Sequence, residues 1–307
     1  MTRVSSFSNQ QVMLTSLMNG QSRVFKDQVQ ITTGKKEDNY SGLAGEISTL
    51  LGAKAVFGQT QGYLRAATHV SRFLRTNDIQ LENMVRNTQN VRDTLLEAIA
   101  QNQTFALDEL LAESFSSMVS ALNSNIGGVH VFGGGRSDIP PVTGSQISDL
   151  VATASVSDLF QNDQLRPTAK IGQNTLTEYG LLADEVGLEV FQIFKNIADF
   201  SAGPLGPLSG ELNAVQSNFL KGEMDNLDTA LDNLRVLVAR NGTRQNNVES
   251  FISEHENQEV FLEVFISDIE DVNVAEAISR LNNDQIALEA SFRITSELTS
   301  LSLLEFI

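Results

Sequence analysis

Residues 64–99 have the sequence LRAATHVSRFLRTNDIQLENMVRNTQNVRDTLLEAI, which carries a clear periodic signal. Together with the residues from 47 onward, its apolar positions recur mostly at gaps of three, four or seven, which places them on one face of an α-helix. They are Ile47, Leu50, Phe57, Leu64, Val70, Leu74, Leu81, Val85, Val91, Leu95 and Ile99. One helix over 47–99 would be about 80 Å long at ~1.5 Å per residue, although glycines at 52, 58 and 62 weaken its first part.

Proline divides the chain into two flanks and a middle. All five prolines fall between Pro140 and Pro207, and no glycine follows Gly242. Because proline breaks helices, the flanks are free to be helical, whereas residues 131–210 form a different kind of structure. In that middle, Leu165–Ile171 before Gly172 indicates a short strand and a turn. Residues 181–200 indicate one amphipathic helix, with an apolar face of Leu188, Phe191, Phe194 and Ile197.

Further helical stripes follow on both flanks. One stripe consists of Leu107, Leu111, Phe115, Met118 and Leu122, and another of Leu212, Val215, Phe219, Met224, Leu227, Leu231, Leu234 and Val238. The second stripe is expected to break at Asn241–Gly242 and to continue through Val248, Phe251, Phe261, Phe265 and Ile269.

The two ends of the chain also read as helices, but with narrow apolar seams. The first seam is Phe7, Leu14, Leu17, Val24 and Ile31, with Gly34 expected as the residue that caps the helix. The second is Val274, Ile278, Leu281, Leu288 and Phe292, beside a further stripe of Ile294, Leu298 and Leu301. Such narrow seams bury little surface alone and need a partner helix. We expect them to serve assembly.

Charge suggests one partner within the molecule and excludes some functions. Residues 1–44 carry five basic and three acidic side chains, a net charge of +2, whereas residues 262–307 carry two basic and nine acidic, a net of −7. The two terminal helices are therefore expected to pair. A formal charge of −17 argues against nucleic-acid binding. No apolar run reaches the roughly 18 residues that span a bilayer.

These observations predict a mainly α fold: a long antiparallel helical hairpin or coiled-coil bundle built from both termini. A small α+β or β-rich outer domain is inserted at its tip. The expected domains are 1–45 plus 270–307 (terminal coiled-coil core), 46–130 plus 211–269 (long-helix shell) and 131–210 (outer inserted domain). Few contacts are expected to cross the boundary of residues 137–205, so that this span could be removed.

Catalytic chemistry is not indicated, and the sequence predicts no catalytic residue, no cofactor and no metal site. The chain has no cysteine and only three histidines, at 69, 130 and 255. Gly133-Gly134-Gly135-Arg136 lacks the ending of a phosphate loop and is read as a turn. His255 stands between Glu254 and Glu256 without a second histidine one turn away, so it is expected on a solvated charged face.

Both ends resemble bacterial flagellins. Residues 31–36 (ITTGKK) followed by 40–47 (YSGLAGEI) look like the end of the first flagellin helix and its connector. Residues 267–277 (SDIEDVNVAEA) resemble the C-terminal "S-x-I-E-D-x-D-x-A" signature. The two motifs occur in the expected order at opposite ends of the chain.

Within that superfamily the chain most resembles the hook–filament junction proteins (hook-associated protein 3). Residues 131–142 (VFGGGRSDIPPV) resemble the "L-F-x-G-x-x-x-x-x-P-P-F" entry into their outer domain, and residues 301–307 (LSLLEFI) resemble their terminus. The alternatives are a flagellin or flagellin-like filament or surface protein, and an unrelated helical adhesin or coiled-coil protein.

The resemblance implies a structural role in the flagellum. The chain would join hook-associated protein 1 to the flagellin filament, with its own copies, these two proteins and a flagellar export chaperone as partners. It would lie outside the cell at the hook–filament junction, exported without a cleaved signal peptide and without insertion into a membrane. Independently, an asymmetric hairpin whose ends leave their seams unburied is expected to associate head to tail into a ring or tube.

Overall fold

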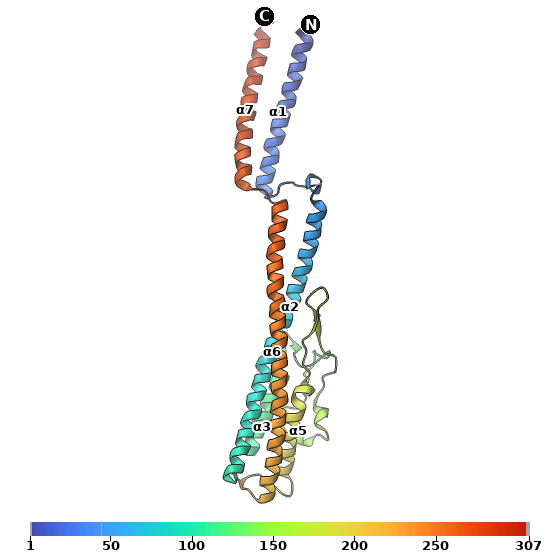
Figure 1. The fold of residues 1–307 in the computed structure, drawn as a ribbon, viewed down its shortest axis with the longest axis vertical. Coiled ribbons are helices and arrows are strands. Elements are labelled where there is room, and N and C mark those ends of the chain that lie inside the picture. Colours follow the sequence, from blue (N-terminus) through green and yellow to red (C-terminus); the bar gives the residue numbers. More distant parts are fainter. Residues whose placement is uncertain (1, 44, 305–307) are drawn as a thin grey trace. The chain divides into compact units, whose positions relative to one another are not determined.

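The computed structural model describes residues 2–43 and 45–304, with side chains for residue 8 and residues 11–43 and 45–297. It contains two compact units, and Figure 1 traces the chain through them. The first unit combines Met1–Gln59 with Gln258–Ile307, and the second is Thr60–Asn257. Helices α2 (Ile47–Gln101) and α6 (Ala214–Glu270) contribute residues to both.

In the second unit, α2 and α6 run antiparallel. Arg92 on α2 pairs with Asp228 on α6 (Nε–Oδ1 2.8 Å), whereas Leu74, earlier on α2, accepts a hydrogen bond of 2.8 Å from Asn241, later on α6. Helices α3 (Leu107–Leu122) and α5 (Ala183–Ala202) pack against each other and share the core of α2 and α6. The expected mainly α fold with long antiparallel helices is confirmed.

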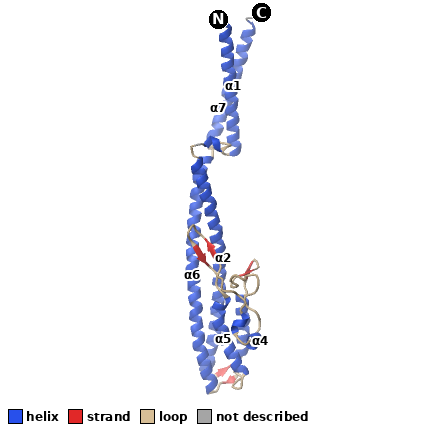
Figure 2. Ribbon diagram, turned by 90° about the vertical axis from the view of Figure 1, so that its right-hand side faces the viewer, coloured by secondary structure: helices blue, strands red, loops and turns tan. Residues whose placement is uncertain are grey.

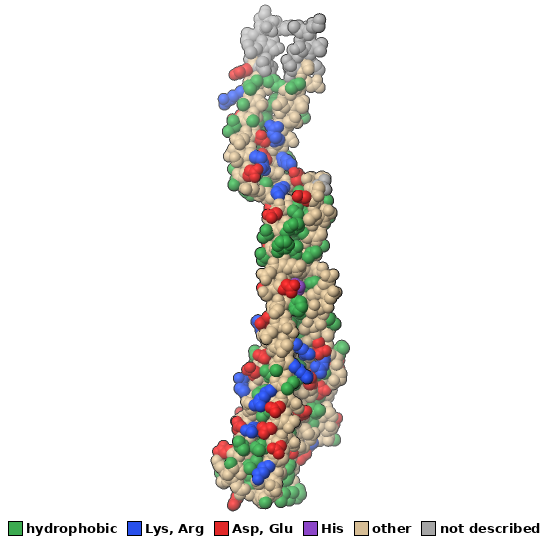
Figure 3. All heavy atoms as spheres, viewed as in Figure 1, with side chains coloured by type: hydrophobic (Ala, Val, Ile, Leu, Met, Phe, Trp, Pro, Cys, Tyr) green, Lys and Arg blue, Asp and Glu red, His purple; other side chains and the backbone are tan. Residues whose placement is uncertain are grey.

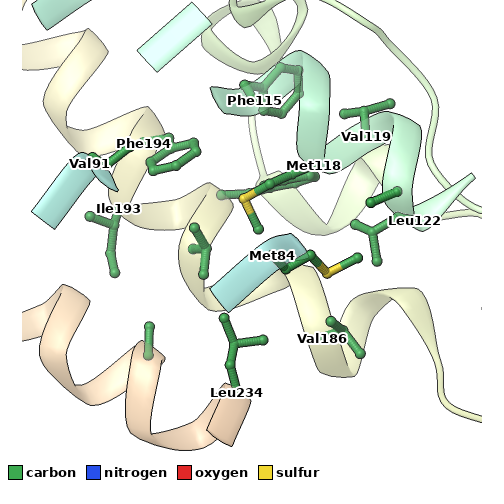
Figure 4. Packing of buried hydrophobic residues seen from close by; sticks show 14 of the residues in the cluster. Met84, Val91, Phe115, Met118, Val119, Leu122, Val186, Ile193, Phe194 and Leu234 are labelled. Carbon is green, nitrogen blue, oxygen red and sulfur yellow. The ribbon is translucent and has the colours of Figure 1, made fainter. Parts of the chain in front are cut away.

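One hydrophobic core joins helices α2, α3, α5 and α6. Figure 4 shows part of it, where Met84 and Val91 of α2, Phe115, Met118, Val119 and Leu122 of α3, Val186, Ile193 and Phe194 of α5, and Leu234 of α6 pack together. The aromatic rings of Phe115 and Phe191 lie 4.8 Å apart. Because α5 lies inside residues 137–205, the expectation that few contacts cross the boundary of that span is wrong.

The strands are short, as Figure 2 shows, and they form two-stranded sheets. Strands β4 (Thr168–Lys170) and β5 (Leu176–Glu178) form an antiparallel hairpin with Ala169 opposite Thr177, and Gly172 lies in its turn. The remaining pairs are also antiparallel: β2 (Asn125–Ile126) with β3 (Val129–His130), and β1 (Gln103–Thr104) with β6 (Gly210–Glu211). The middle of the chain further holds α4 (Ile147–Ala152) and the 3₁₀ turn η2 (Val156–Leu159). The strand and turn expected at 165–172 are confirmed.

The expectations for Asn241–Gly242, Leu188 and His255 are wrong. Asn241–Gly242 does not interrupt α6, because the buried Asn241 side chain bonds to α2 and the helix continues through it. Leu188 is exposed on α5, since the buried face turns through Val190, Phe194 and Ile197 instead. His255 is buried rather than solvated, and its Nε2 donates a hydrogen bond of 2.7 Å to the Ile171 carbonyl.

The contrast between Phe194 and Leu188 gives a stability prediction. Phe194 is fully buried, so Phe194→Ala should lower the free energy of unfolding by about 3–5 kcal/mol, through lost burial and the cavity left behind. Leu188→Ala on the exposed side of the same helix should change it by less than ~1 kcal/mol. Urea unfolding followed by circular dichroism measures both. Equal losses would contradict the assignment of the buried face of α5.

The first unit contains α1 (Thr2–Thr33), the 3₁₀ turn η1 (Tyr40–Leu43), the beginning of α2, the end of α6, and α7 (Val274–Leu304). Helices α1 and α7 lie side by side over much of their length, which confirms the expected pairing of the terminal helices. Leu50 and Ala53 of α2 and Leu262 and Ile269 of α6 are buried. None of the described helices combines the length and apolarity needed to span a membrane.

Candidate assembly surface

Residues 34–36, which follow α1, contact residues 270–272 at the end of α6, and we call this set of contacts the connector clamp. Helix α1 ends at Thr33, and Gly34 follows with φ +71°, the left-handed conformation that glycine favours and that caps a helix. Beyond this turn the chain meets the end of α6 as an isolated antiparallel bridge between Lys35 and Asp271. Lys36 N donates to the Glu270 carbonyl at 2.7 Å, and Val272 N donates to the Gly34 carbonyl at 2.9 Å.

Ion pairs reinforce this clamp. Lys35 Nζ lies 2.6 Å from Asp271 Oδ1 and 3.1 Å from Glu270 Oε2, and Lys54 on α2 pairs with the other oxygen of Glu270. Ser267 Oγ donates to Asp271 Oδ2 at 2.6 Å. The Glu270 carboxylate therefore ties the connector after α1 to the first turns of α2.

These contacts shift the pKa values of the clamp. The hydrogen bond to Asp271 raises the pKa of Lys35 above its usual 10.5, although burial opposes the shift. Hydrogen bonds from Lys35 and Ser267 hold the pKa of Asp271 below 3.8. Burial would raise the pKa of Glu270, but hydrogen bonds from Lys54 and Lys35 outweigh it and keep the value below 4.5.

We expect the clamp to open in acid. Carboxyl groups with a lowered pKa stabilise the folded state fully above their unfolded values, and this contribution is lost as the pH falls through the folded values. The carboxylate contribution should therefore be complete above about pH 5 and be lost as the pH falls through the lowered pKa values of Glu270 and Asp271. That of Lys35 persists up to pH 10.5 and is lost as the pH rises through its raised value. NMR signals of the Lys36 and Val272 amides, which bridge the clamp, would report its opening.

A matched pair of variants tests the origin of this pH dependence. Lys35→Met should move the opening to higher pH, because Glu270 and Asp271 return toward their usual pKa values. Lys26→Met should leave it unchanged, because Lys26 pairs with Glu37 instead. Amide signals that stay constant down to pH 2.5 would contradict the clamp.

The seam between α1 and α7 is small and polar. Gly20 faces Leu288, so closely that a Cβ atom at Gly20 would lie 3.2 Å from the Leu288 side chain. Arg23 pairs with Asp284 at 3.2 Å. Arg280 lies 3.5 Å from the buried carboxylate of Asp27, and it donates a hydrogen bond of 2.9 Å to Gln30 Oε1. As α1 advances, these contacts step back along α7, so the two helices are antiparallel in one register.

Large apolar side chains lie on another face of α1. Leu14, Met18 and Phe25 are 54%, 69% and 67% exposed. At about 100° per residue they fall within about 40° of one another around the helix, whereas Leu17 and Gly20, on the side that meets α7, lie about 60° and about 120° from Leu14. We call these three residues the α1 stripe.

A second apolar surface lies near the end of α6. Val260, Phe261 and Val264 are 61%, 67% and 56% exposed, and the ring of Phe261 stacks on that of Phe265 at 6.3 Å. Figure 3 shows hydrophobic side chains gathered over this part of α6. We call these four residues the α6 patch. Phe261 is therefore not the core residue that its stripe predicts.

Residues 224–307 match the family model for the bacterial flagellin C-terminal helical region. This range contains the end of α6, the α6 side of the clamp and α7. The C-terminal region of this chain is flagellin-like. The C-terminal resemblance read from residues 267–277 is thereby confirmed. Those residues supply Ser267, Glu270 and Asp271 of the clamp.

Solved structures define the fold of this chain. A Vibrio parahaemolyticus protein described as a flagellar hook-associated protein is 16% identical, with a TM-score of 0.52 over 72% of this chain and 96% of that one. FlgL from Xanthomonas campestris is 13% identical, with a TM-score of 0.58 over 70% of this chain and 99% of that one. The chain has the fold of these flagellar proteins. No curated protein matches its sequence.

The residues that the sequence assigned to an assembly seam differ in their burial. Leu17 is buried, and Val24, Ile31, Leu281 and Leu288 are half-buried. Leu14, Val274, Ile278 and Phe292 are exposed. The side chains of Phe7, Leu298 and Leu301 lie outside the described part of the chain. Contacts of these residues with another copy stay a prediction.

Sequence reasoning missed the polar contacts of the seam and the α6 patch. The patch had a signal, because apolar residues at 260–262 and 264–266 surround the helix instead of forming one stripe. For the seam, the opposite charge of the two ends indicated that the helices pair, but the positions of Gly20, Asp27 and Gln30 had no signal, because they have no apolar spacing.

The glycine cluster of the chain makes a turn. Gly134 has φ +66°, and the backbone amide of Gly135 donates to Asp163 Oδ1 at 2.7 Å. Within the described residues, no three His, Asp or Glu side chains gather where they could hold a metal ion.

Proposed function

We propose that this chain is a structural subunit of the bacterial flagellum. In this proposal it joins hook-associated protein 1 to the flagellin filament by heterologous helix–helix packing. One observation carries it: α1 turns Leu14, Met18 and Phe25 to solvent while it presents Gly20 and Asp27 to α7. A surface helix ordinarily turns its apolar face inward, so an outward stripe calls for a partner.

Copies of the chain itself are the first partners. The α1–α7 pair leaves the stripe uncovered, and covering it with a neighbouring copy would stabilise each subunit by roughly 25 cal/mol for every Å² of apolar surface removed from water. A repeated contact between unlike surfaces produces a ring or a tube. The terminal helices (1–45 and 270–307) would form its inner part, with 46–130 and 211–269 as a shell and 131–210 outermost.

Other partners follow from the flagellin-like C-terminal region and the hook-associated fold. Hook-associated protein 1 would bind on one side and flagellin on the other, with an export chaperone beforehand. The chain would be extracellular at the hook–filament junction, without binding nucleic acid or inserting into a membrane. Its role is structural, not enzymatic.

The second candidate is a flagellin of the filament itself, which the match of residues 224–307 favours. Electron microscopy of cells that lack the gene separates the two. Hooks without filaments support the junction role, and filaments that are thinned or missing as a subset support the flagellin role. Cells with unchanged flagella would contradict both, provided that the gene is expressed.

A further inference from the structure

The α6 patch has no cover among the described residues. Val260, Phe261 and Val264 are exposed and fall within about 100° around α6, and the half-buried Phe265 lies between them and the buried face of Leu262 and Ile269. Single exposed apolar residues are ordinary on proteins, but three together beside a half-buried ring, on two adjacent i,i+4 rows, mark an interaction surface.

The α1 stripe of the same chain is not available to cover the patch. Helix α1 packs against α7 through Gly20, Arg23 and Asp27, and the clamp holds the residue after its end, Lys35, against α6. The α1 stripe and the α6 patch are therefore both left exposed in the first unit, as are Val274, Ile278 and Phe292 on α7.

We propose that the α1 stripe of one copy packs on the α6 patch of the next copy. This inference rests on the proposed function and names the surface that receives the stripe. Leu14 and Met18 form an i,i+4 row, as do Val260 with Val264 and Phe261 with Phe265. Rows of this kind interdigitate in the commonest class of helix packing. The unbranched side chain of Met18 adapts to an irregular surface between aromatic rings.

Charge selects this pairing over contacts between like surfaces. The α1 segment carries Arg3, Arg23 and Lys26 against Asp27, a net charge of +2. The last turns of α6, residues 258–270, carry four acidic side chains and no basic one. Among these, Glu263 and Asp268 are exposed and make no ion pair within the described residues. Patch against patch would bring the unpaired carboxylates of two α6 helices together, whereas α1, whose Arg23 and Lys26 already pair with Asp284 and Glu37, adds no like charge to the patch.

Cysteine cross-linking tests the contact directly, because the natural chain has no cysteine. One copy carries Met18→Cys and the other Phe261→Cys, both expressed in cells that lack the native gene. We expect a disulfide-linked dimer in isolated, oxidised flagella. The matched controls are Asn19→Cys and Glu263→Cys, exposed positions on other faces of the same helices. Pairs containing either control should give less than about a tenth of the dimer.

The outcomes separate this inference from the proposed function. If the chain is present in flagella and the 18–261 pair gives no more dimer than the controls, the inference is overturned and the proposed function stands. Dimers from Met18→Cys alone or Phe261→Cys alone, in excess of the mixed pair, would also overturn it, because they indicate contacts between like surfaces. If the chain is absent from flagella, the proposed function fails. The same pairs oxidised in a concentrated solution of the purified chain then decide whether stripe and patch meet.

Discussion

A chain that carries both Leu14→Asp and Met18→Asp should fold normally and fail to assemble. Both side chains are exposed in the single chain, so the thermal melt should move by no more than about 1–2 °C. In an assembled contact, each aspartate would be an unpaired charge buried against apolar side chains, at a cost of about 3–5 kcal/mol. Two such charges exceed what a helix–helix contact can supply, and filaments per cell in a complemented null strain should fall to the uncomplemented level.

The matched control lies one residue from the stripe. Leu17 is buried against α7, so Leu17→Asp should destabilise the α1–α7 pair itself. Circular dichroism of the purified chain should then show lost helix, which the stripe variant retains. Normal filaments with the stripe variant, or equal loss of helix in both variants, would show that the stripe is not an assembly surface.

Deletion of residues 137–205, with a short glycine–serine linker in its place, should unfold the second unit. Helix α5 lies in this span and buries Val190, Phe191, Phe194 and Ile197 completely. At about 1.5–3 kcal/mol for each large apolar side chain, their loss alone approaches the 5–15 kcal/mol that stabilises a typical domain. The deletion also exposes the faces of α2, α3 and α6 that share the core.

Limited proteolysis and the cooperativity of thermal unfolding would measure this effect. The control removes only Gln173 and Asn174, which are exposed at the tip of the β4–β5 hairpin, and it should melt close to the parent chain. A cooperative melt in the long deletion would show that the helical shell is independent of α5. The expected division into three domains would then gain support.

The sequence predicts the long helices well because their apolar periodicity and their burial coincide. Leu74, Leu81, Val91 and Leu95 recur at helical spacing, and all four are fully buried. Glycines at 52, 58 and 62 do not break α2, because tertiary packing overrides a propensity cost of about 1 kcal/mol for each.

The exposed apolar surfaces are harder to predict, because the type of a residue does not show which side of its helix packs against another helix. Leu14 and Leu17 belong to one seam by spacing, yet Leu14 is exposed and Leu17 is buried. The distinction follows from α7, whose Leu288 and Asp284 meet Gly20 and Arg23. Likewise, His255 reads as solvated between two glutamates, and its burial depends on Ile171, which lies 84 positions away in the chain.

The close approach at Gly20 has an evolutionary consequence. A Cβ atom there would lie 3.2 Å from the end of the Leu288 side chain, so any other residue at position 20 requires Leu288 to shift by a few tenths of an ångström or to be replaced by a smaller residue. Substitutions at these two positions should therefore be inherited together. Among related sequences that keep this pairing, an alanine or serine at position 20 would accompany a shorter side chain at position 288.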